Sequence, residues 1–263
     1  MTMQATGTFK ITSWDEKPFS EVEGGGKLTQ ASVIKTYAPI ADDRSRMQRY
    51  FGFALTALYL WLSVCAADVA PRESIKADPR YQNPALLEAA WALPVARQYR
   101  ESFEYQVNPM FCGPATAVNV LKSLGIKKYQ QSNVFDPSSI SYFKALAAGL
   151  TLDEMATLLH DASGWKVTAL HDLTLAQFRE HLKRSNDPAQ RYTINFHRKP
   201  LWGYSAGHHS PIGGYLEKED LVFVLDVYDP FKPFLVSSER LFEAMNTVDD
   251  EAGKTRGLLL ITH

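Results

Sequence analysis

An uncharged run of 17 residues, Phe51–Ala67, divides the chain and limits what either side of it can fold into. Three arginines precede the run, and small residues stand directly before Asp68. A basic region, an apolar stretch and small residues ahead of a cleavage point are typical of a secretory signal peptide. We therefore expect residues 47–67 to be a signal peptide that is cleaved before Asp68, with a retained membrane anchor as the alternative.

This prediction also sets the localisation. A cleaved chain is exported to the periplasm or secreted, whereas an uncleaved chain stays anchored and contacts the membrane through residues 51–67. Residues 62–65 also resemble a lipoprotein cleavage box. The alternative interpretation that involves no membrane is a buried core helix. The absence of a polar face from the run disfavours it.

Residues 1–46 precede the expected signal peptide, although a signal peptide normally stands at the start of a protein. The segment 8–37 alternates apolar and polar residues around three consecutive glycines, which is typical of two strands joined by a turn. It resembles the opening of a family of small β-barrel domains of unknown function, but two strands cannot close a barrel. We expect a doubtful leader here: either translation starts at Met47, or the segment is a remnant of a fused or mispredicted reading frame. The alternative is an inward-facing N-terminal hairpin with residues 51–67 retained as an anchor.

The 196 residues after the run have the length of a single domain. Residues 68–84 contain three prolines and are expected to form a linker, which leaves 85–263 as the folded domain. The formal net charge of −1 excludes a globally basic nucleic-acid binder, so no nucleic-acid partner is expected. Two cysteines are too few for a zinc ribbon or a disulfide-rich scaffold.

Hydrophobic periodicity predicts an α+β fold, with a helical part followed by an antiparallel sheet. Helices are expected at 86–99, where Pro94 bends or ends the helix, and at 114–124, 151–160, 174–183 and near 239–246. Strands are expected at 165–170, 192–196, 211–215, 221–228 and 257–262.

Cys112 is the only cysteine that remains once the segment containing Cys65 is removed. Pro114 suits the first turn of a helix, so Cys112 is expected just ahead of a helix N-terminus, where the helix dipole lowers the pKa of a thiol. Gly113 is expected to leave the backbone open to a substrate. A nucleophile and a small buried hydrophobe are both consistent with this setting.

A thiolate nucleophile needs a base, and the base needs an orienting group. His208 stands at the entry of one predicted strand and Asp226 within the next. The segment 217–220 between them is typical of a hairpin turn, which would bring the two residues close together. An aspartate in an apolar strand is costly without a partner. His209 is a competing candidate for the base.

Three separated motifs together resemble the phytochelatin synthase family, in the short bacterial form without the C-terminal extension. They are Cys-Gly ahead of a helix, Gly-His-x-Ser-Pro-Ile-Gly-Gly-Tyr at 207–215 and Leu-Asp-Val at 225–227. The resemblance covers roughly residues 106–261 and implies a papain-like catalytic domain within 85–263. It also implies a catalytic triad and an oxyanion-binding glutamine, and these roles fall on Cys112, His208, Asp226 and Gln106.

The same resemblance implies a reaction. Family members cleave the Cys–Gly bond of glutathione through a γ-glutamylcysteinyl thioester, which water or a second glutathione then resolves. Asn195, Gly207 and Arg256 match the residues expected to hold the γ-glutamyl end. No resident cofactor or protein-bound metal is expected; Cd²⁺ or Zn²⁺ would enter as glutathione thiolates or as activators in a metal response. A homodimer is left open.

One departure from the family pattern bears on the second step. The family has an arginine shortly after Leu-Asp-Val, where this chain has Asp229 with only Lys232 nearby. Hydrolysis to γ-glutamylcysteine is therefore expected at least as much as transfer that yields phytochelatin. The alternatives are a papain-like peptidase for double-glycine leader peptides and a non-catalytic periplasmic module that binds thiols or metals through Cys112 and His208.

Overall fold

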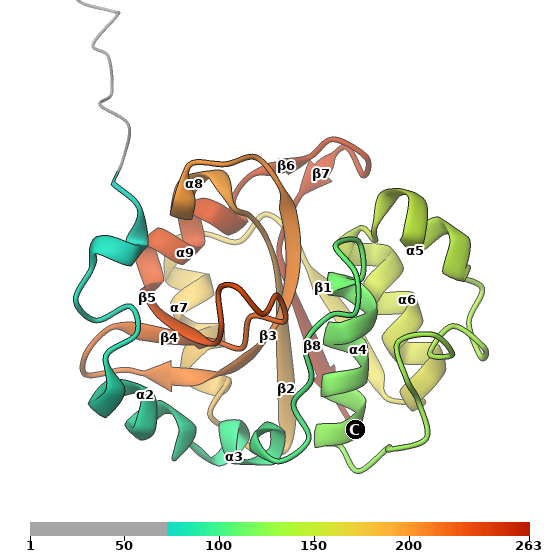
Figure 1. Ribbon diagram of the computed structural model, residues 1–263, viewed down its shortest axis with the longest axis horizontal. Helices are drawn as coiled ribbons and strands as arrows, with labels where there is room; N and C mark the ends of the chain where they lie inside the picture. Colours follow the sequence, from blue (N-terminus) through green and yellow to red (C-terminus); the bar gives the residue numbers. More distant parts are fainter. Residues whose placement is uncertain (1–72) are drawn as a thin grey trace, which may run out of the picture. The chain divides into compact units, whose positions relative to one another are not determined.

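The computed structural model describes residues 73–263 (Figure 1). The expected leader at 1–46 and the expected signal segment at 47–67 lie outside the described residues, as does the first part of the expected linker. Within 73–263, no helix combines the length and the apolar character needed to cross a membrane.

A six-stranded antiparallel sheet forms the centre of the described domain, in the order β1-β8-β2-β3-β4-β5. A separate two-stranded hairpin, β6–β7, lies at the top of Figure 1. The strands are β1 (Lys166–Leu170), β2 (Gln190–His197), β3 (Gly207–Leu216), β4 (Leu221–Val224), β5 (Phe234–Ser237), β6 (Val248–Asp249), β7 (Lys254–Thr255) and β8 (Leu258–Thr262).

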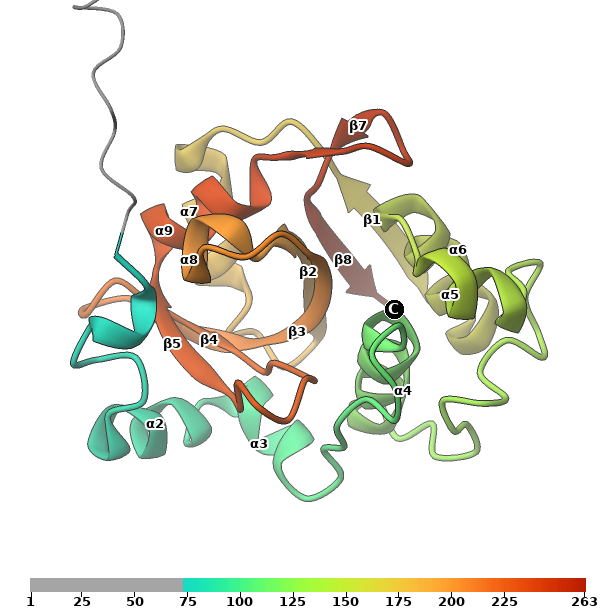
Figure 2. The same ribbon diagram turned by 45° about the horizontal axis from the view of Figure 1, so that its top comes forward.

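Helices cover both faces of the sheet, and α5 lies beside α6 in both ribbon views (Figures 1 and 2). One face carries α2 (Pro84–Trp91), α3 (Pro94–Arg100), α4 (Cys112–Ser123) and α6 (Leu152–Ser163). The other carries α7 (Leu175–Arg184) and α9 (Ser238–Met245), and the short elements are η1 (Ile75–Ala77), α5 (Tyr142–Ala148) and α8 (Lys199–Trp202). The predicted α+β class is confirmed.

Each face of the sheet has its own apolar core, because side chains alternate across a strand. On β2, Ile194 and Phe196 join the core that contains Phe178 of α7. The core on the opposite face contains Val118 of α4 and Leu158 of α6. Helix α4 is thus packed against one face of the sheet, next to β3 and α6.

Local sequence signals set the helix boundaries. The expected helix 86–99 is two helices, because Pro94 cannot continue one and instead takes the first position of α3 after an extended Leu93. The predicted capping box at Thr151 opens α6, and the Thr174–Gln177 pair opens α7 in the same way.

The expected strand 221–228 is shorter in the structure, since β4 ends at Val224. The Leu225 N–H still donates to the Pro211 carbonyl of β3 at 3.0 Å. Proline has no N–H with which to return a bond, so the ladder ends here and Asp226 leaves the sheet. Val227 then accepts a hydrogen bond from the Gln106 N–H at 2.8 Å.

The described part of the expected linker packs onto the domain. Ile75 and Tyr81 are buried, and the Tyr81 ring stacks on Phe234 with 5.5 Å between ring centroids. The Leu235 N–H of β5 donates to the Tyr81 carbonyl at 2.9 Å. Residues 73–83 therefore belong to the folded unit, although the three prolines of residues 68–84 predict a linker.

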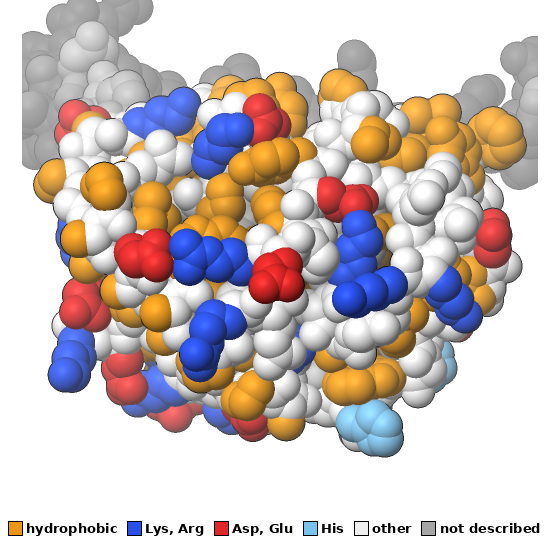
Figure 3. Space-filling view, turned by 60° about the horizontal axis from the view of Figure 1, so that its bottom comes forward, with side chains coloured by type: hydrophobic (Ala, Val, Ile, Leu, Met, Phe, Trp, Pro, Cys, Tyr) orange, Lys and Arg blue, Asp and Glu red, His pale blue; other side chains and the backbone are white. Residues whose placement is uncertain are grey.

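Figure 3 shows the face that lies at the bottom of Figure 1. Lysine and arginine side chains alternate there with aspartate and glutamate, and apolar side chains lie between them. This described face carries no large patch of one sign, in line with the net charge of −1 for the whole chain.

Candidate active site

Helix α4 begins at Cys112 itself, with Phe111 as its N-cap residue, so the cysteine lies one position further into the helix than expected. The Cys112 side chain is buried. The first helical hydrogen bond runs from the Ala115 N–H to the Phe111 carbonyl at 2.9 Å. N–H groups in a first helical turn have no partner within the helix, so they face any negative charge that develops beside the sulfur.

The structure explains Gly113 by packing, whereas the sequence predicted that this glycine leaves the backbone open to a substrate. A Cβ atom at this position would lie 2.9 Å from Leu150 Cδ1, so the residue lets α4 pack closely against Leu150. The expectation of an open backbone for a substrate at Gly113 is therefore wrong. The close contact instead fixes Leu150, which forms part of the wall of the pocket around Cys112.

His208, the second residue of β3, is buried and lies 2.9 Å from Asp226, measured from Nε2 to Oδ1. This contact leaves Nδ1 for Cys112, and the interaction between the two side chains lowers the pKa of the thiol and raises the pKa of His208. His208, rather than its neighbour His209, is thus the histidine between the thiol and the carboxylate. A helix that begins at the cysteine and packs on an antiparallel sheet bearing the histidine is the papain-like arrangement implied by the resemblance.

Asp226 has a second cationic partner that the sequence analysis missed. Buried Arg198, which follows β2, lies 3.0 Å from the Asp226 carboxylate, and the Tyr228 N–H donates to Oδ1 at 2.8 Å. The Arg198 guanidinium lies over Phe231, 4.4 Å from the ring centroid. A buried aspartate in an apolar run signals that a cation is needed, but no spacing pattern pointed to residue 198.

These contacts shift the three pKa values in a consistent way. Burial raises the pKa of the Cys112 thiol, but the hydrogen bond and charge of His208 outweigh it, and the pKa lies below its ordinary value. Burial lowers the pKa of His208, but the charge of Asp226 prevails and raises it. Burial likewise raises the pKa of Asp226, and His208 and Arg198 bring it below the ordinary value. The arrangement favours a thiolate beside an imidazolium.

Cys112 and His208 open into a pocket of about 300 Å³ that also contains all three expected substrate-binding residues, Asn195, Gly207 and Arg256. Other parts of its wall come from the segment 148–150 and from Asp249 and Glu251 of the β6–β7 hairpin. Residues that are far apart in the chain are therefore brought together around one thiol.

Arg256 is the cation of this pocket. Its Nη1 donates to Asn195 Oδ1 at 2.9 Å and to Asp249 Oδ2 at 2.7 Å, while its buried Nε has no hydrogen-bond partner among the described residues. A Cβ atom on Gly207 would lie 3.0 Å from this Nη1. Glycine at 207 therefore gives the guanidinium the space that it occupies.

Gln106 lies beside the Asp226 segment, to which its backbone N–H is bonded. Its side-chain Nε2 donates to the Asn108 carbonyl at 2.8 Å. An amide nitrogen has two hydrogens, so one N–H is not used by this bond, and Gln106 is not among the residues that line the pocket around Cys112. The buried Oε1 has no partner among the described residues.

His209 is held away from the Cys112–His208–Asp226 line. Its Nε2 lies 2.8 Å from the Leu150 carbonyl and 2.7 Å from Asn195 Nδ2. Burial lowers the pKa of His209 to about 4, so its side chain is neutral near pH 7. The His209 backbone hydrogen-bonds the Cys112 side chain, which helps to lower the thiol pKa.

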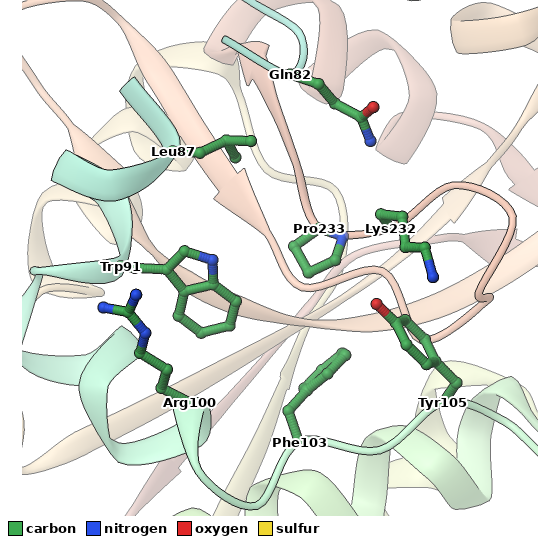
Figure 4. A pocket seen from close by; sticks show the side chains of 8 residues that line it. All are labelled: Gln82, Leu87, Trp91, Arg100, Phe103, Tyr105, Lys232 and Pro233. Carbon is green, nitrogen blue, oxygen red and sulfur yellow. The ribbon is translucent and has the colours of Figure 1, made fainter. Parts of the chain in front are cut away.

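A larger hollow of about 500 Å³ lies elsewhere on the domain (Figure 4). Trp91, Phe103 and Tyr105 supply aromatic rings, and the cationic side chains of Arg100 and Lys232 stand at its edges. None of the expected site residues lines this hollow, whereas Cys112, His208 and Arg256 line the smaller pocket, which is therefore the candidate active site. Among residues 73–263, no three histidine, cysteine, aspartate or glutamate side chains are grouped so as to hold a metal ion.

The protein-family model described as phytochelatin synthase matches residues 73–258. Glutathione gamma-glutamylcysteinyltransferase 1 of Lotus japonicus is 34% identical over 172 residues, which are 61% of this chain and 34% of that relative. The glutathione gamma-glutamylcysteinyltransferase of Schizosaccharomyces pombe is 28% identical over 167 residues, 59% of this chain and 40% of its own length. The chain thus spans well under half the length of these curated relatives.

Two solved structures are also similar. A C39-like peptidase from Bacillus anthracis is 15% identical, with 61% of this chain and 94% of that one covered and a TM-score of 0.44. The peptidase domain of Streptococcus ComA, a bi-functional ABC transporter, is 16% identical, with 61% and 97% covered and a TM-score of 0.41.

Proposed function

Because the chain belongs to the phytochelatin synthase family, we propose that it is a thiol enzyme that cleaves the Cys–Gly bond of glutathione. The relatives described above are named glutathione gamma-glutamylcysteinyltransferases, which supports glutathione as the substrate. The observation that carries the proposal is the line from Cys112 through His208 to Asp226, which opens into a pocket containing Arg256. A pocket of about 300 Å³ suits a small peptide better than a long leader sequence.

In the first step, the Cys112 thiolate attacks the carbonyl carbon of the cysteinyl residue of glutathione. The carbonyl oxygen becomes an oxyanion, which the Cys112 N–H and the free amide N–H of Gln106 stabilise. The C–N bond then breaks, the protonated His208 gives its proton to the leaving amine, and glycine departs. A γ-glutamylcysteinyl thioester remains on Cys112.

In the second step, neutral His208 takes a proton from the incoming nucleophile, and the C–S bond breaks as the thiolate re-forms. Water yields γ-glutamylcysteine, whereas the amino group of a second glutathione yields a phytochelatin. We favour hydrolysis, because Asp229 stands where the family has a basic residue and Lys232 is ion-paired with that aspartate.

Arg256 would bind the α-carboxylate of the γ-glutamyl residue. Its buried, unpartnered Nε supports this role, since a buried donor without an acceptor is costly and a ligand carboxylate would satisfy it. Asn195 and Gly207 position the guanidinium through a hydrogen bond and through the space that glycine leaves.

Heavy-metal ions enter the proposal as part of the substrate. Cd²⁺ or Zn²⁺ would arrive as glutathione thiolates, which links the reaction to a metal response without a resident metal. We further propose that the domain works outside the cytoplasm after cleavage before Asp68. N-terminal sequencing of the natural protein tests this, and a mature start upstream of Asp68 would refute cleavage there.

The decisive experiment follows glycine release from glutathione by the purified protein, with and without Cd²⁺, and identifies the acyl products. We expect glycine and γ-glutamylcysteine from the protein and no turnover by Cys112→Ser. Abundant longer γ-glutamylcysteine oligomers would overturn the preference for hydrolysis. Glycine release by Cys112→Ser would overturn the assignment of the nucleophile.

A further inference from the structure

We propose that His171 is a positioning residue whose charged imidazole clamps the β6–β7 hairpin against α6, so that this wall of the pocket is held at low pH and loosened as the pH rises. His171 follows β1 directly and does not line the pocket around Cys112. The hairpin supplies Asp249 and Glu251 to that pocket. The clamp is independent of the proposed function, and only its effect on glutathione turnover rests on that function.

The β6–β7 hairpin depends on polar contacts for its position. None of residues 248–255 is buried, and Val248 is 59% exposed. A segment with few buried apolar side chains opens at little cost in free energy. Glu251 is anchored by Lys144 of α5, and Thr255 at the end of the hairpin is anchored by the chain that follows β1. A change in the contacts of Thr255 therefore changes how firmly the hairpin is held beside the pocket.

His171 contacts two hydrogen-bond acceptors at once. Its Nδ1 lies 2.6 Å from the Thr255 carbonyl oxygen of β7, and its Nε2 lies 3.0 Å from Asp153 Oδ1 of α6. A carbonyl oxygen can only accept, and Asp153 is a carboxylate near neutral pH, because hydrogen bonds from Lys254 and His171 lower its pKa. Both ring nitrogens must therefore donate, which only the imidazolium can do. A neutral ring has one N–H and loses one of the two bonds.

The backbone on either side fixes the imidazole between its acceptors. Asp172 takes a left-handed conformation, with φ of 53°, and its N–H donates to Thr255 Oγ1 at 3.0 Å. A Cβ atom on Gly257 would collide with the Leu170 carbonyl oxygen, so glycine lets the end of β1 approach the strand that follows the hairpin. The ring thus lies between its two acceptors whatever its charge, and the charge decides how many of the two bonds form.

Several other charged groups lie on the elements around this clamp. Lys254 of β7 lies 2.7 Å from Asp153 Oδ2, so that carboxylate keeps a cation when the imidazole loses its proton. Asp172 accepts a hydrogen bond from the Thr255 hydroxyl at 2.8 Å. The remaining groups form the ion pairs Arg256–Asp249, Lys144–Glu154 and Lys144–Glu251.

His197, the last residue of β2, allows a competing explanation. Burial and the charge of Arg256 lower its pKa, and Asp250 and Asp249 of the hairpin act on it in the opposite direction. Loss of its proton would also change the charge that faces the hairpin. Separate substitutions of His171 and His197 distinguish the two explanations.

The test measures hydrogen–deuterium exchange of the hairpin in the full chain at about pH 6 and about pH 8, corrected for the intrinsic exchange rate at each pH. In the unmodified protein we expect residues 248–255 to exchange about fivefold faster at the higher pH, as fits the loss of one hydrogen bond. His171→Phe keeps a ring without N–H donors and should exchange fast at both pH values. His171→Arg keeps a charge and several donors and should exchange slowly at both. His197→Gln, the matched control, should behave like the unmodified protein.

Equal exchange at the two pH values in the unmodified protein would overturn the inference. A pH dependence that remains in His171→Phe, or that disappears in His197→Gln, would overturn it as well.

The glycine-release assay tests the effect on the pocket. The KM for glutathione should rise more with pH in the unmodified protein than in His171→Arg, a comparison in which the titrations of Cys112 and His208 cancel. The same rise in both proteins would overturn the link between the clamp and the pocket. The absence of any glycine release would instead refute the proposed function and leave the exchange result standing.

Discussion

Asp226 is the residue at which the charges of the site converge. It accepts hydrogen bonds from His208, Arg198 and the Tyr228 backbone while fully buried. The carboxylate therefore does two things at once: it orients the imidazole, and it neutralises a buried guanidinium. A substitution at this residue is therefore expected to have two effects, one on catalysis and one on stability. Each can be measured in its own assay.

Asp226→Asn should lower kcat for glycine release by about a hundredfold or more, because the amide no longer stabilises the imidazolium. It should also cost about 3 kcal/mol of unfolding free energy, since Arg198 is left buried without a counter-charge. Urea unfolding measures the second effect. Asp229→Asn, which removes an exposed carboxylate paired with Lys232, is the matched control and should change stability little. Equal stability of the two variants would contradict the buried pairing.

The reactivity of Cys112 should follow the pKa directions given above. Because His208 holds the thiol pKa below its ordinary value, iodoacetamide should alkylate Cys112 rapidly at pH 6. In His208→Ala the hydrogen bond and the charge are gone and burial still raises the thiol pKa. Alkylation at pH 6 should then be at least about tenfold slower and should recover as the pH rises.

Mass spectrometry of the peptide containing Cys112 follows this labelling and separates it from any labelling of Cys65. His160→Ala is the control, since His160 is an exposed residue of α6 outside the pocket. An unchanged alkylation profile in His208→Ala would mean that the imidazole does not activate the thiol. The same shifts predict that kcat/KM falls in acid, as the thiolate is protonated, and falls in alkali, as the imidazolium loses its proton above its ordinary pKa.

Stability has a pH dependence of its own. The pKa of Asp226 is depressed in the folded protein, so its contribution to stability is present above the pKa of an unfolded aspartate. That contribution is lost as the pH falls through the depressed value. As the pH is lowered, the free energy of unfolding should therefore fall more steeply for the unmodified protein than for Asp226→Asn.

At the scale of elements, the predictable features are those with a local cause. The capping residues Thr151 and Thr174 mark two helix starts, and Pro94 separates two helices. The end of β4 was not predictable in this way, because it depends on the missing N–H of Pro211 on the neighbouring strand. The role of Arg198 was not predictable for a similar reason, because it depends on the carboxylate of a residue 28 positions later in the chain. The contact between His208 and Asp226 was predictable because a single hairpin joins the two residues.

The two capping boxes provide a matched pair of variants. Thr151→Ala and Thr174→Ala should each cost about 1 kcal/mol of unfolding free energy in urea, because each removes a hydrogen bond to an N–H of the first helical turn. Only Thr151 follows Leu150, which lines the pocket. Thr151→Ala should therefore also raise the KM for glutathione, whereas Thr174→Ala should not. A rise in both would show that the effect reports general stability instead of the pocket wall.

At the scale of the whole molecule, the family match includes a segment that the sequence predicted to be linker. The model of the family covers residues 73–258. The segment 73–83, expected to be linker, is held by the stacking of Tyr81 on Phe234 and by a hydrogen bond to β5. The boundary of the folded unit therefore lies before this segment.

Two truncations test this boundary. A chain that begins at Asp68 should unfold at the same urea concentration as the full chain and release glycine from glutathione at the same rate. A chain that begins at Pro84 loses the buried side chains of Ile75 and Tyr81, which should cost about 3 kcal/mol or more. Tyr81→Ala in the full chain separates lost packing from lost length and should account for much of that cost. If the chain beginning at Pro84 is as stable as the one beginning at Asp68, residues 73–83 are a tether after all.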